Sequence, residues 1–85
     1  MLKSPEIQSL QTAFVMVNCE TGHEIDVIEQ IRSIEGIKES HRTSGSHDIF
    51  CRIEVERVES LREIIEQKIR KTPCVISTTT LIKSA

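Results

Sequence analysis

Hydrophobic and polar positions divide this chain of 85 residues into segments of two kinds. Short runs rich in β-branched residues, or with partial alternation, predict strands. Longer segments with apolar residues every three or four positions predict amphipathic helices. The predicted strands are residues 12–19, 37–43, 48–55 and 74–82, with the polar second strand expected at an edge.

Local signals place the ends of the two predicted helices. Thr21 and Glu24 fit a capping box, and Gly36 is a plausible stop for the first helix. The dipeptide Thr72-Pro73 ends the second helix. The helical stripes are Ile25, Val27, Ile28, Ile31 and Ile34 in the first helix, and Val58, Leu61, Ile64, Ile65 and Ile69 in the second.

The resulting order is β-α-β-β-α-β, and residues 31–37 echo residues 69–75 in the second half. A repeated βαβ unit predicts an α+β, ferredoxin-like fold. Right-handed crossovers then place both helices on one face of a four-stranded antiparallel sheet. We expect the domain to span residues 12–83, after an N-terminal arm at 1–11 in which Ser4 and Pro5 can start a short helix.

Two helices cover one face of such a sheet, yet both faces of the predicted strands are apolar. One set is Phe14, Met16 and Phe50, and the opposite set is Val15, Val17, Ile49 and Ile53. One of these sets therefore lies on the helix-free face. Exposed apolar patches of this kind usually mark interaction surfaces, so we predict a two-fold, sheet-to-sheet homodimer.

Composition excludes several classes of function. Two aromatic residues are too few for a single-stranded nucleic-acid platform, and a net charge of −2 argues against direct DNA or RNA binding. No apolar run reaches membrane-spanning length, and the start of the chain lacks the apolar region of an export signal. Three scattered cysteines are therefore expected as reduced thiols in the cytoplasm.

The sequence offers little chemistry of a catalytic kind. Cys19 and Cys74 fall on strands that pair in this topology, so the thiols can lie close, but buried cysteines usually act as small hydrophobes. His23, His41 and His47 have no recognised ligand spacing. We predict no enzyme, no metal site and no cofactor.

Five segments together resemble a known family. They are Ala13-Phe14-Val15-Met16-Val17-Asn18, Gly36-Ile37-Lys38-Glu39, Thr43-Ser44-Gly45-Ser46-His47-Asp48-Ile49, Ile69-Arg70-Lys71-Thr72-Pro73 and Ser77-Thr78-Thr79-Thr80-Leu81-Ile82. The chain is similar to the effector-binding RAM domain of the Lrp/AsnC (feast/famine) transcription regulators. It departs from the family pattern at His47, usually an aromatic residue, and at Cys74, commonly glycine. Eleven residues before the domain cannot encode the family's helix-turn-helix, so the resemblance is to the stand-alone type.

The resemblance implies a dimer that assembles further, often into rings of four dimers, with amino-acid effectors at the dimer–dimer contacts. The matching ligand-binding residues are Gly45, Ser46, His47, Asp48, Thr79, Thr80 and Leu81. Asp48 can accept a hydrogen bond from an effector's ammonium group, and backbone N–H groups near Gly45 or the threonine hydroxyls can hold its carboxylate. The alternative for Asp48 is a carboxylate that only caps its own turn.

The resemblance and the residues together predict a non-enzymatic amino-acid sensor and oligomerisation module. It would act by changing its assembly state or by forming mixed oligomers with helix-turn-helix relatives. The alternatives are a ligand-free assembly adaptor, or an enzyme or metal-binding protein of the same fold. The sequence does not identify the effector, the ring size or the protein partner.

Overall fold

The structure is a computed structural model that describes residues 10–83. Most of the predicted arm, with the short helix expected after Ser4, lies outside the described residues. Gln11, assigned to that arm, belongs to the first strand.

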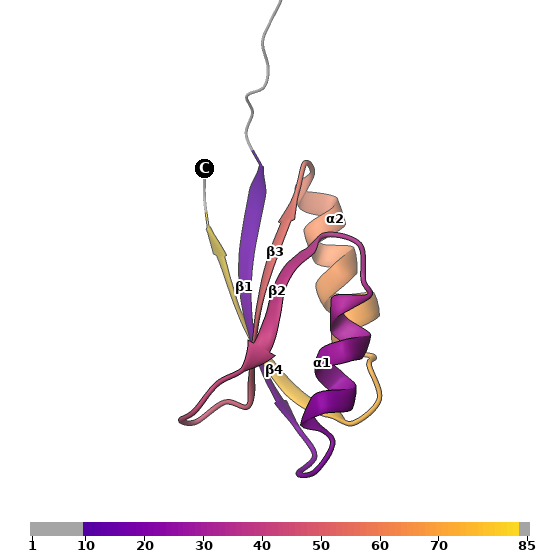
Figure 1. Cartoon of the computed structure of the whole chain (residues 1–85). Helices are drawn as coiled ribbons and strands as arrows, with labels where there is room; N and C mark the ends of the chain where they lie inside the picture. The colour runs from indigo at the N-terminus through magenta and orange to yellow at the C-terminus, as the bar shows by residue number, and fades with distance from the viewer. Residues whose placement is uncertain (1–9, 84–85) are drawn as a thin grey trace, which may run out of the picture.

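A four-stranded antiparallel sheet forms one layer, and the helices form the other (Figure 1). The strand order is β2-β3-β1-β4. The elements are β1 (Gln11–Cys19), α1 (Glu24–Arg32), β2 (Ile37–Arg42), β3 (Ile49–Val55), α2 (Val58–Glu63), η1 (Ile64–Ile69) and β4 (Val75–Lys83). This confirms the predicted α+β, ferredoxin-like fold, with β2 at one edge.

The core lies between the sheet and the helices. Val15 and Val17 on β1, and Ile49 and Ile53 on β3, are fully buried there. They meet apolar side chains from α1, α2 and η1, which include Val27, Ile31, Leu61 and Ile69. The sequence left open which parity faces the helices, and the structure assigns the valine and isoleucine set to that side.

The start of α1 differs from the predicted capping box. His23, not Thr21, is the N-cap residue, and its side chain makes no capping hydrogen bond. The Glu24 carboxylate instead accepts a hydrogen bond from the Gly22 N–H at 3.1 Å. The box fails because Gly22 takes a φ of +91°, which turns the chain before the helix begins.

The end of α1 also comes earlier than predicted. The helix stops at Arg32 with Ser33 as its C-cap, and the Ser33 hydroxyl donates to the Gln30 carbonyl at 2.7 Å. Gly36 lies farther on, in the turn into β2, with a φ of +100°. This glycine lies beside β3, where the Glu54 N–H donates to the Gly36 carbonyl at 3.0 Å.

The second predicted helix is continuous but changes its winding. It begins as α2 and continues as the π-helical segment η1, where the Arg70 N–H donates to the Ile65 carbonyl at 3.0 Å. Leu61, Ile64, Ile65 and Ile69 are buried as the stripe predicts, whereas Val58 is exposed. The following strand begins at Val75, one residue later than predicted, because Cys74 has a φ of +73°.

Candidate functional site

The turn between β2 and β3 holds four of the predicted ligand residues. Figure 1 shows this turn reaching out on the side of the sheet away from the helices. The Thr43 N–H donates to the Asp48 carbonyl at 2.9 Å, and the Thr43 hydroxyl donates to the His47 carbonyl at 2.8 Å. These bonds close the base of the turn. Gly45 takes a φ of +109° at its tip, as turn chemistry predicts.

Asp48 fastens this turn to β1. Its N–H donates to the Val17 carbonyl at 3.0 Å, and its carboxylate Oδ2 accepts the Cys19 N–H at 2.9 Å. The carboxylate therefore accepts from the backbone of a neighbouring strand and not from its own turn. Its Oδ1 has no hydrogen-bond partner among residues 10–83, so one oxygen stays available to a ligand.

His47 connects the turn to the last strand. Its Nε2 lies 3.5 Å from the Thr79 hydroxyl on β4, and its Nδ1 lies 3.2 Å from the Ser46 hydroxyl. The predicted proximity of the turn to β4 is thus present in the structure. Within the described part of the chain, the N–H groups of residues 44–47 make no hydrogen bond.

The three predicted residues on β4 do not share one face of the sheet. Thr79 is paired with Met16, and Leu81 with Phe14, so both lie on the helix-free face. Thr80 is paired with Val15 and lines a hollow with Arg62 and Arg70 on the helix side. This difference could have been predicted from the sequence, because neighbouring residues of a strand point to opposite faces of the sheet.

The helix-free face has an apolar centre with a charged border. Phe14 and Phe50 lie with ring centroids 5.9 Å apart, and His41 lies 5.4 Å from Phe50. The half-buried Met16 and the exposed Leu81 extend this apolar area. The border is formed by the ion pairs of Arg52 with Glu39 and Glu54.

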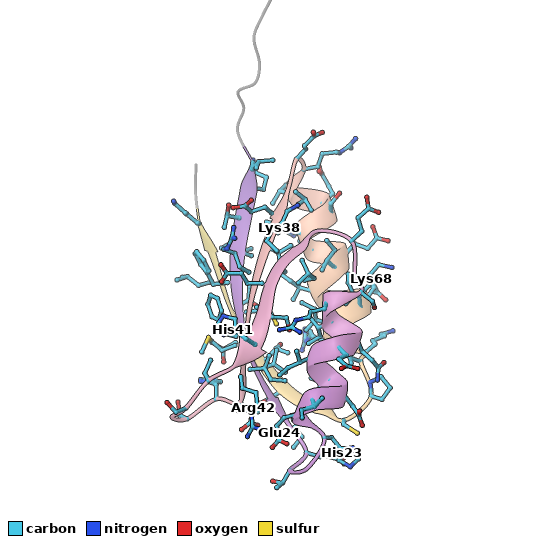
Figure 2. All side chains as sticks on the ribbon, in the orientation of Figure 1. His23, Glu24, Lys38, His41, Arg42 and Lys68 are labelled. Atoms are coloured by element: carbon cyan, nitrogen blue, oxygen red, sulfur yellow. The ribbon has the colours of Figure 1, made fainter. Side chains whose placement is uncertain are left out.

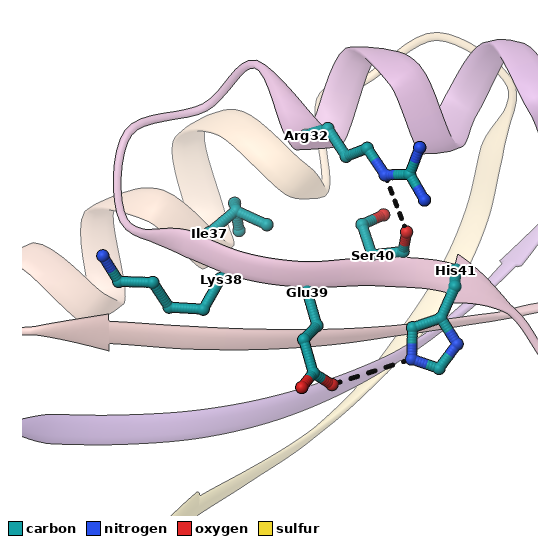
Figure 3. A pocket seen from close by; sticks show the side chains of 6 residues that line it. All are labelled: Arg32, Ile37, Lys38, Glu39, Ser40 and His41. Carbon is teal, nitrogen blue, oxygen red and sulfur yellow. Dashed lines mark hydrogen bonds and ion pairs between the residues drawn. The ribbon is translucent and has the colours of Figure 1, made fainter.

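A hollow of about 420 Å³ follows the edge strand β2 (Figure 3). The Arg32 Nε donates to the Ser40 carbonyl at 3.0 Å, which ties the end of α1 to this strand. On the other side of the strand, Glu39 Oε1 lies 3.7 Å from His41 Nε2. Larger still is a hollow of about 540 Å³ between the end of β3 and α2. Neither includes the turn at residues 43–48.

All three thiols are free. Burial raises the pKa of the Cys51 thiol to about 11, despite its contact with the Ser40 hydroxyl. The pKa of Cys19 is raised by burial and then by the Asp48 carboxylate. Cys19 pairs with Val75, so the expected closeness of Cys19 and Cys74 agrees with the register.

Among residues 10–83, three side chains of types that can bind a metal ion lie close together, which the sequence did not predict. Donor atoms of Glu20, His23 and Cys74 all lie within 4.8 Å of one another. The sequence signal is weak because Cys74 comes from the far end of the chain. The pairing of β1 with β4 is what brings it beside the Glu20-x-x-His23 turn.

Across residues 10–83, every helix is too short or too polar to cross a membrane.

A sequence model of the Lrp/AsnC ligand binding domain matches residues 12–83. The chain belongs to this family. An uncharacterized HTH-type transcriptional regulator of Pyrococcus furiosus is 30% identical over 74 residues, which cover 84% of this chain and 49% of that protein. The chain thus spans about half the length of this curated relative.

Two solved structures show the same fold as this Lrp/AsnC domain. The hypothetical protein PHS023 of Pyrococcus horikoshii is 29% identical, with a TM-score of 0.83 over 88% of this chain and 90% of that chain. AsnC of E. coli is 20% identical, with a TM-score of 0.79 over 86% of this chain and 50% of that chain. The protein is therefore related to transcription regulators through their ligand-binding part.

Proposed function

We propose that this Lrp/AsnC domain is a non-enzymatic sensor that binds a free amino acid and couples binding to assembly of several copies. The observation that carries the proposal is the geometry of the 43–48 turn. The turn offers unpaired backbone N–H groups at residues 44–47 and one free carboxylate oxygen of Asp48, and its His47 Nε2 lies 3.5 Å from the Thr79 hydroxyl on β4.

An amino acid carries a carboxylate and an ammonium group on the same carbon. The N–H groups around Gly45, with the Thr79 hydroxyl, supply donors for the carboxylate. Asp48 supplies a charged acceptor for the ammonium group, and a charge-assisted hydrogen bond is stronger than a neutral one. The turn is open in one copy, so a neighbouring dimer would complete the enclosure.

The family assignment supports this proposal. The curated relative is a transcriptional regulator that is about twice as long as this chain. A protein that shares its ligand-binding part can form mixed oligomers with such a regulator through the apolar face, which would modulate the regulator without direct DNA contact. The predicted cytoplasmic location fits such a role.

Calorimetry and static light scattering with each standard amino acid test the proposal. We expect one or a few to release heat and to change the mass of the assembly. Thr79→Val should weaken that affinity about three- to tenfold, because one hydrogen bond is lost. Thr80→Val is the matched control, since this threonine faces the helices, and it should bind like the unaltered protein.

Absence of heat and of any mass change with all amino acids would overturn the sensor. A stable oligomer under those conditions would instead indicate the ligand-free assembly adaptor. Equal loss of affinity in the Thr79 and Thr80 variants would place the ligand elsewhere.

A further inference from the structure

We propose that Glu20, His23 and Cys74 form a binding site for a divalent transition-metal ion, with Zn²⁺ as the best match. The site lies at the end of the molecule where β1 turns into α1. Figure 2 shows His23 at this end, at the start of α1. The site is separate from the 43–48 turn and does not depend on the proposed sensing of amino acids.

The donor atoms are nearly close enough to share one ion. The carboxylate oxygen, imidazole nitrogen and thiol sulfur lie within 4.8 Å of one another. Tetrahedral zinc with bonds of about 2.0–2.3 Å holds such atoms roughly 3.4–3.6 Å apart. Rotation of these side chains is then needed to bring the three atoms to the spacing that zinc requires.

Backbone hydrogen bonds already hold these residues together. The Glu20 N–H donates to the Cys74 carbonyl at 2.9 Å, and the His23 N–H donates to the Glu20 carbonyl at 3.1 Å. Each ligand is thereby anchored to another ligand. A preformed cluster of this kind binds an ion with little further ordering.

The backbone of Cys74 is also strained. Its φ of +73° is favourable for glycine, and Cys74 is the one non-glycine residue with positive φ among residues 10–83. A residue with a Cβ atom is strained in this conformation. Strained residues of this kind gather at functional sites, and a thiol that binds metal gives the strain a purpose.

The electrostatic surroundings favour a cation. The carboxylates of Glu20 and Asp26 both lie near the Cys74 thiol. The two negative charges would attract a dipositive ion. The bound ion would in turn stabilise the Cys74 thiolate. Glu20 and His23 are exposed and Cys74 is half-buried, so an ion can enter from solvent.

The donor set selects the class of metal. Sulfur, imidazole nitrogen and carboxylate oxygen together are typical ligands for zinc, whereas Mg²⁺ and Ca²⁺ prefer oxygen alone. Three protein ligands leave a fourth position for water or for a group from another molecule.

Metal titration of the full chain, freed of metal with a chelator and kept reduced, tests the site. We expect one Zn²⁺ or Co²⁺ per chain, and the Co²⁺ form should show the near-ultraviolet charge-transfer band of a thiolate ligand. Cys74→Gly should abolish this band and weaken Zn²⁺ binding at least about tenfold, as second-shell changes alone commonly do. Because glycine suits a positive φ, this variant should fold at least as stably as the parent.

His23→Asn and Glu20→Gln should also weaken Zn²⁺ binding at least about tenfold. Glu24→Gln is the matched control: it removes a nearby carboxylate outside the cluster, keeps an oxygen for the Gly22 N–H, and should leave Zn²⁺ affinity within about twofold. Absence of stoichiometric binding, a Co²⁺ spectrum without the thiolate band, or unchanged affinity in the Cys74 or His23 variant would each overturn the proposal.

Discussion

Gly36 illustrates how one missing Cβ atom determines a tertiary contact. A Cβ built at this position would lie 2.9 Å from Ile64 Cδ1 and 2.9 Å from Val55 Cγ1. Its φ of +100° is also unfavourable for other residues. The turn into β2 can therefore pack directly against the second helix and β3, which no larger residue permits.

Gly36→Ala should lower the free energy of unfolding by about 2–5 kcal/mol, which combines backbone strain with overpacking. Gly45→Ala is the matched control, because its φ is +109° but nothing lies within 4 Å of the added Cβ. In this control the free energy of unfolding should fall by about 1–2 kcal/mol, from backbone strain alone. Urea denaturation measures both, and equal losses would show that the close packing at Gly36 contributes nothing.

The Cys51 thiol predicts how stability responds to alkaline pH. Its pKa in the folded protein is about 11 against an ordinary value of 9.0. Between these values the unfolded chain releases the proton and the folded chain retains it. The stabilisation is therefore complete below pH 9.0 and decreases as the pH rises toward about 11, by about 2–3 kcal/mol in total.

Urea denaturation of the reduced protein at pH 8 and above checks this decrease. The pKa values of Cys19 and Cys74 are raised too, so they act in the same direction. Cys51→Ala should show a shallower decrease than the parent. Parallel pH profiles for the two proteins would rule out the buried thiol as the cause.

At the scale of elements, α1 shows where periodicity stops being informative. Ile25 and Ile28 belong to the same predicted stripe, yet Ile25 is 63% exposed and Ile28 is 6% exposed. The helix begins only at Glu24, so its first turn extends past the edge of the core.

Ile28→Ala should therefore cost about 2–5 kcal/mol, from the loss of buried apolar surface and the cavity left behind. Ile25→Ala should change the free energy of unfolding by no more than about 0.5 kcal/mol. Thermal and urea unfolding of the two variants make the comparison within one helix. Similar losses in both would mean that Ile25 is covered by another surface in solution.

The order of elements was predictable because strand and helix periodicities are local properties of the chain. Alternation of Phe14 and Val15 along the strand also showed that both faces of the sheet are apolar. Three other features depend on packing between distant segments. They are the choice of the face that the helices cover, the switch to π-helical winding in η1 and the early end of α1. Sequence patterns contain those contacts only indirectly.

The candidate site also has parts that the sequence predicts and parts that depend on contacts between distant residues. Turn chemistry predicted the 43–48 connection, and the family resemblance pointed to β4. The Oδ2 contact of Asp48 with the Cys19 N–H could not be predicted, because the two residues meet only when β3 extends alongside β1. The cluster of Glu20, His23 and Cys74 depends on pairing between β1 and β4 across more than fifty residues.

For the whole molecule, the main feature is the apolar area on the helix-free face. Phe14, Met16 and Phe50 are half-buried at its centre, and Leu81 is 68% exposed beside them. A second sheet on this face would cover all four side chains, each large enough to contribute roughly 1.5–3 kcal/mol when fully buried. The sheet-to-sheet homodimer therefore stays our prediction for the assembled protein.

Light scattering at micromolar concentration should give at least twice the chain mass of 9.7 kDa. Phe14→Lys should shift the protein toward the single chain, because a charge at the centre of an apolar contact is unfavourable. Ile25→Lys places the same charge on an exposed site of α1 and should leave the mass unchanged. A parent protein with the mass of one chain would contradict the dimer.

The hydrogen bonds at Thr43 and Asp48 also limit what must be ordered when a ligand arrives. Asp48 is bonded to β1, and Thr43 is bonded to Asp48 and His47 across the base of the turn, so the backbone freedom that remains is confined to residues 44–47. Immobilising a residue costs about 1–2 kcal/mol, so fully ordering a tip of four residues would cost up to about 4–8 kcal/mol. Ordering of the tip would therefore offset part of the binding energy of the proposed amino acid, while the base of the turn keeps one position.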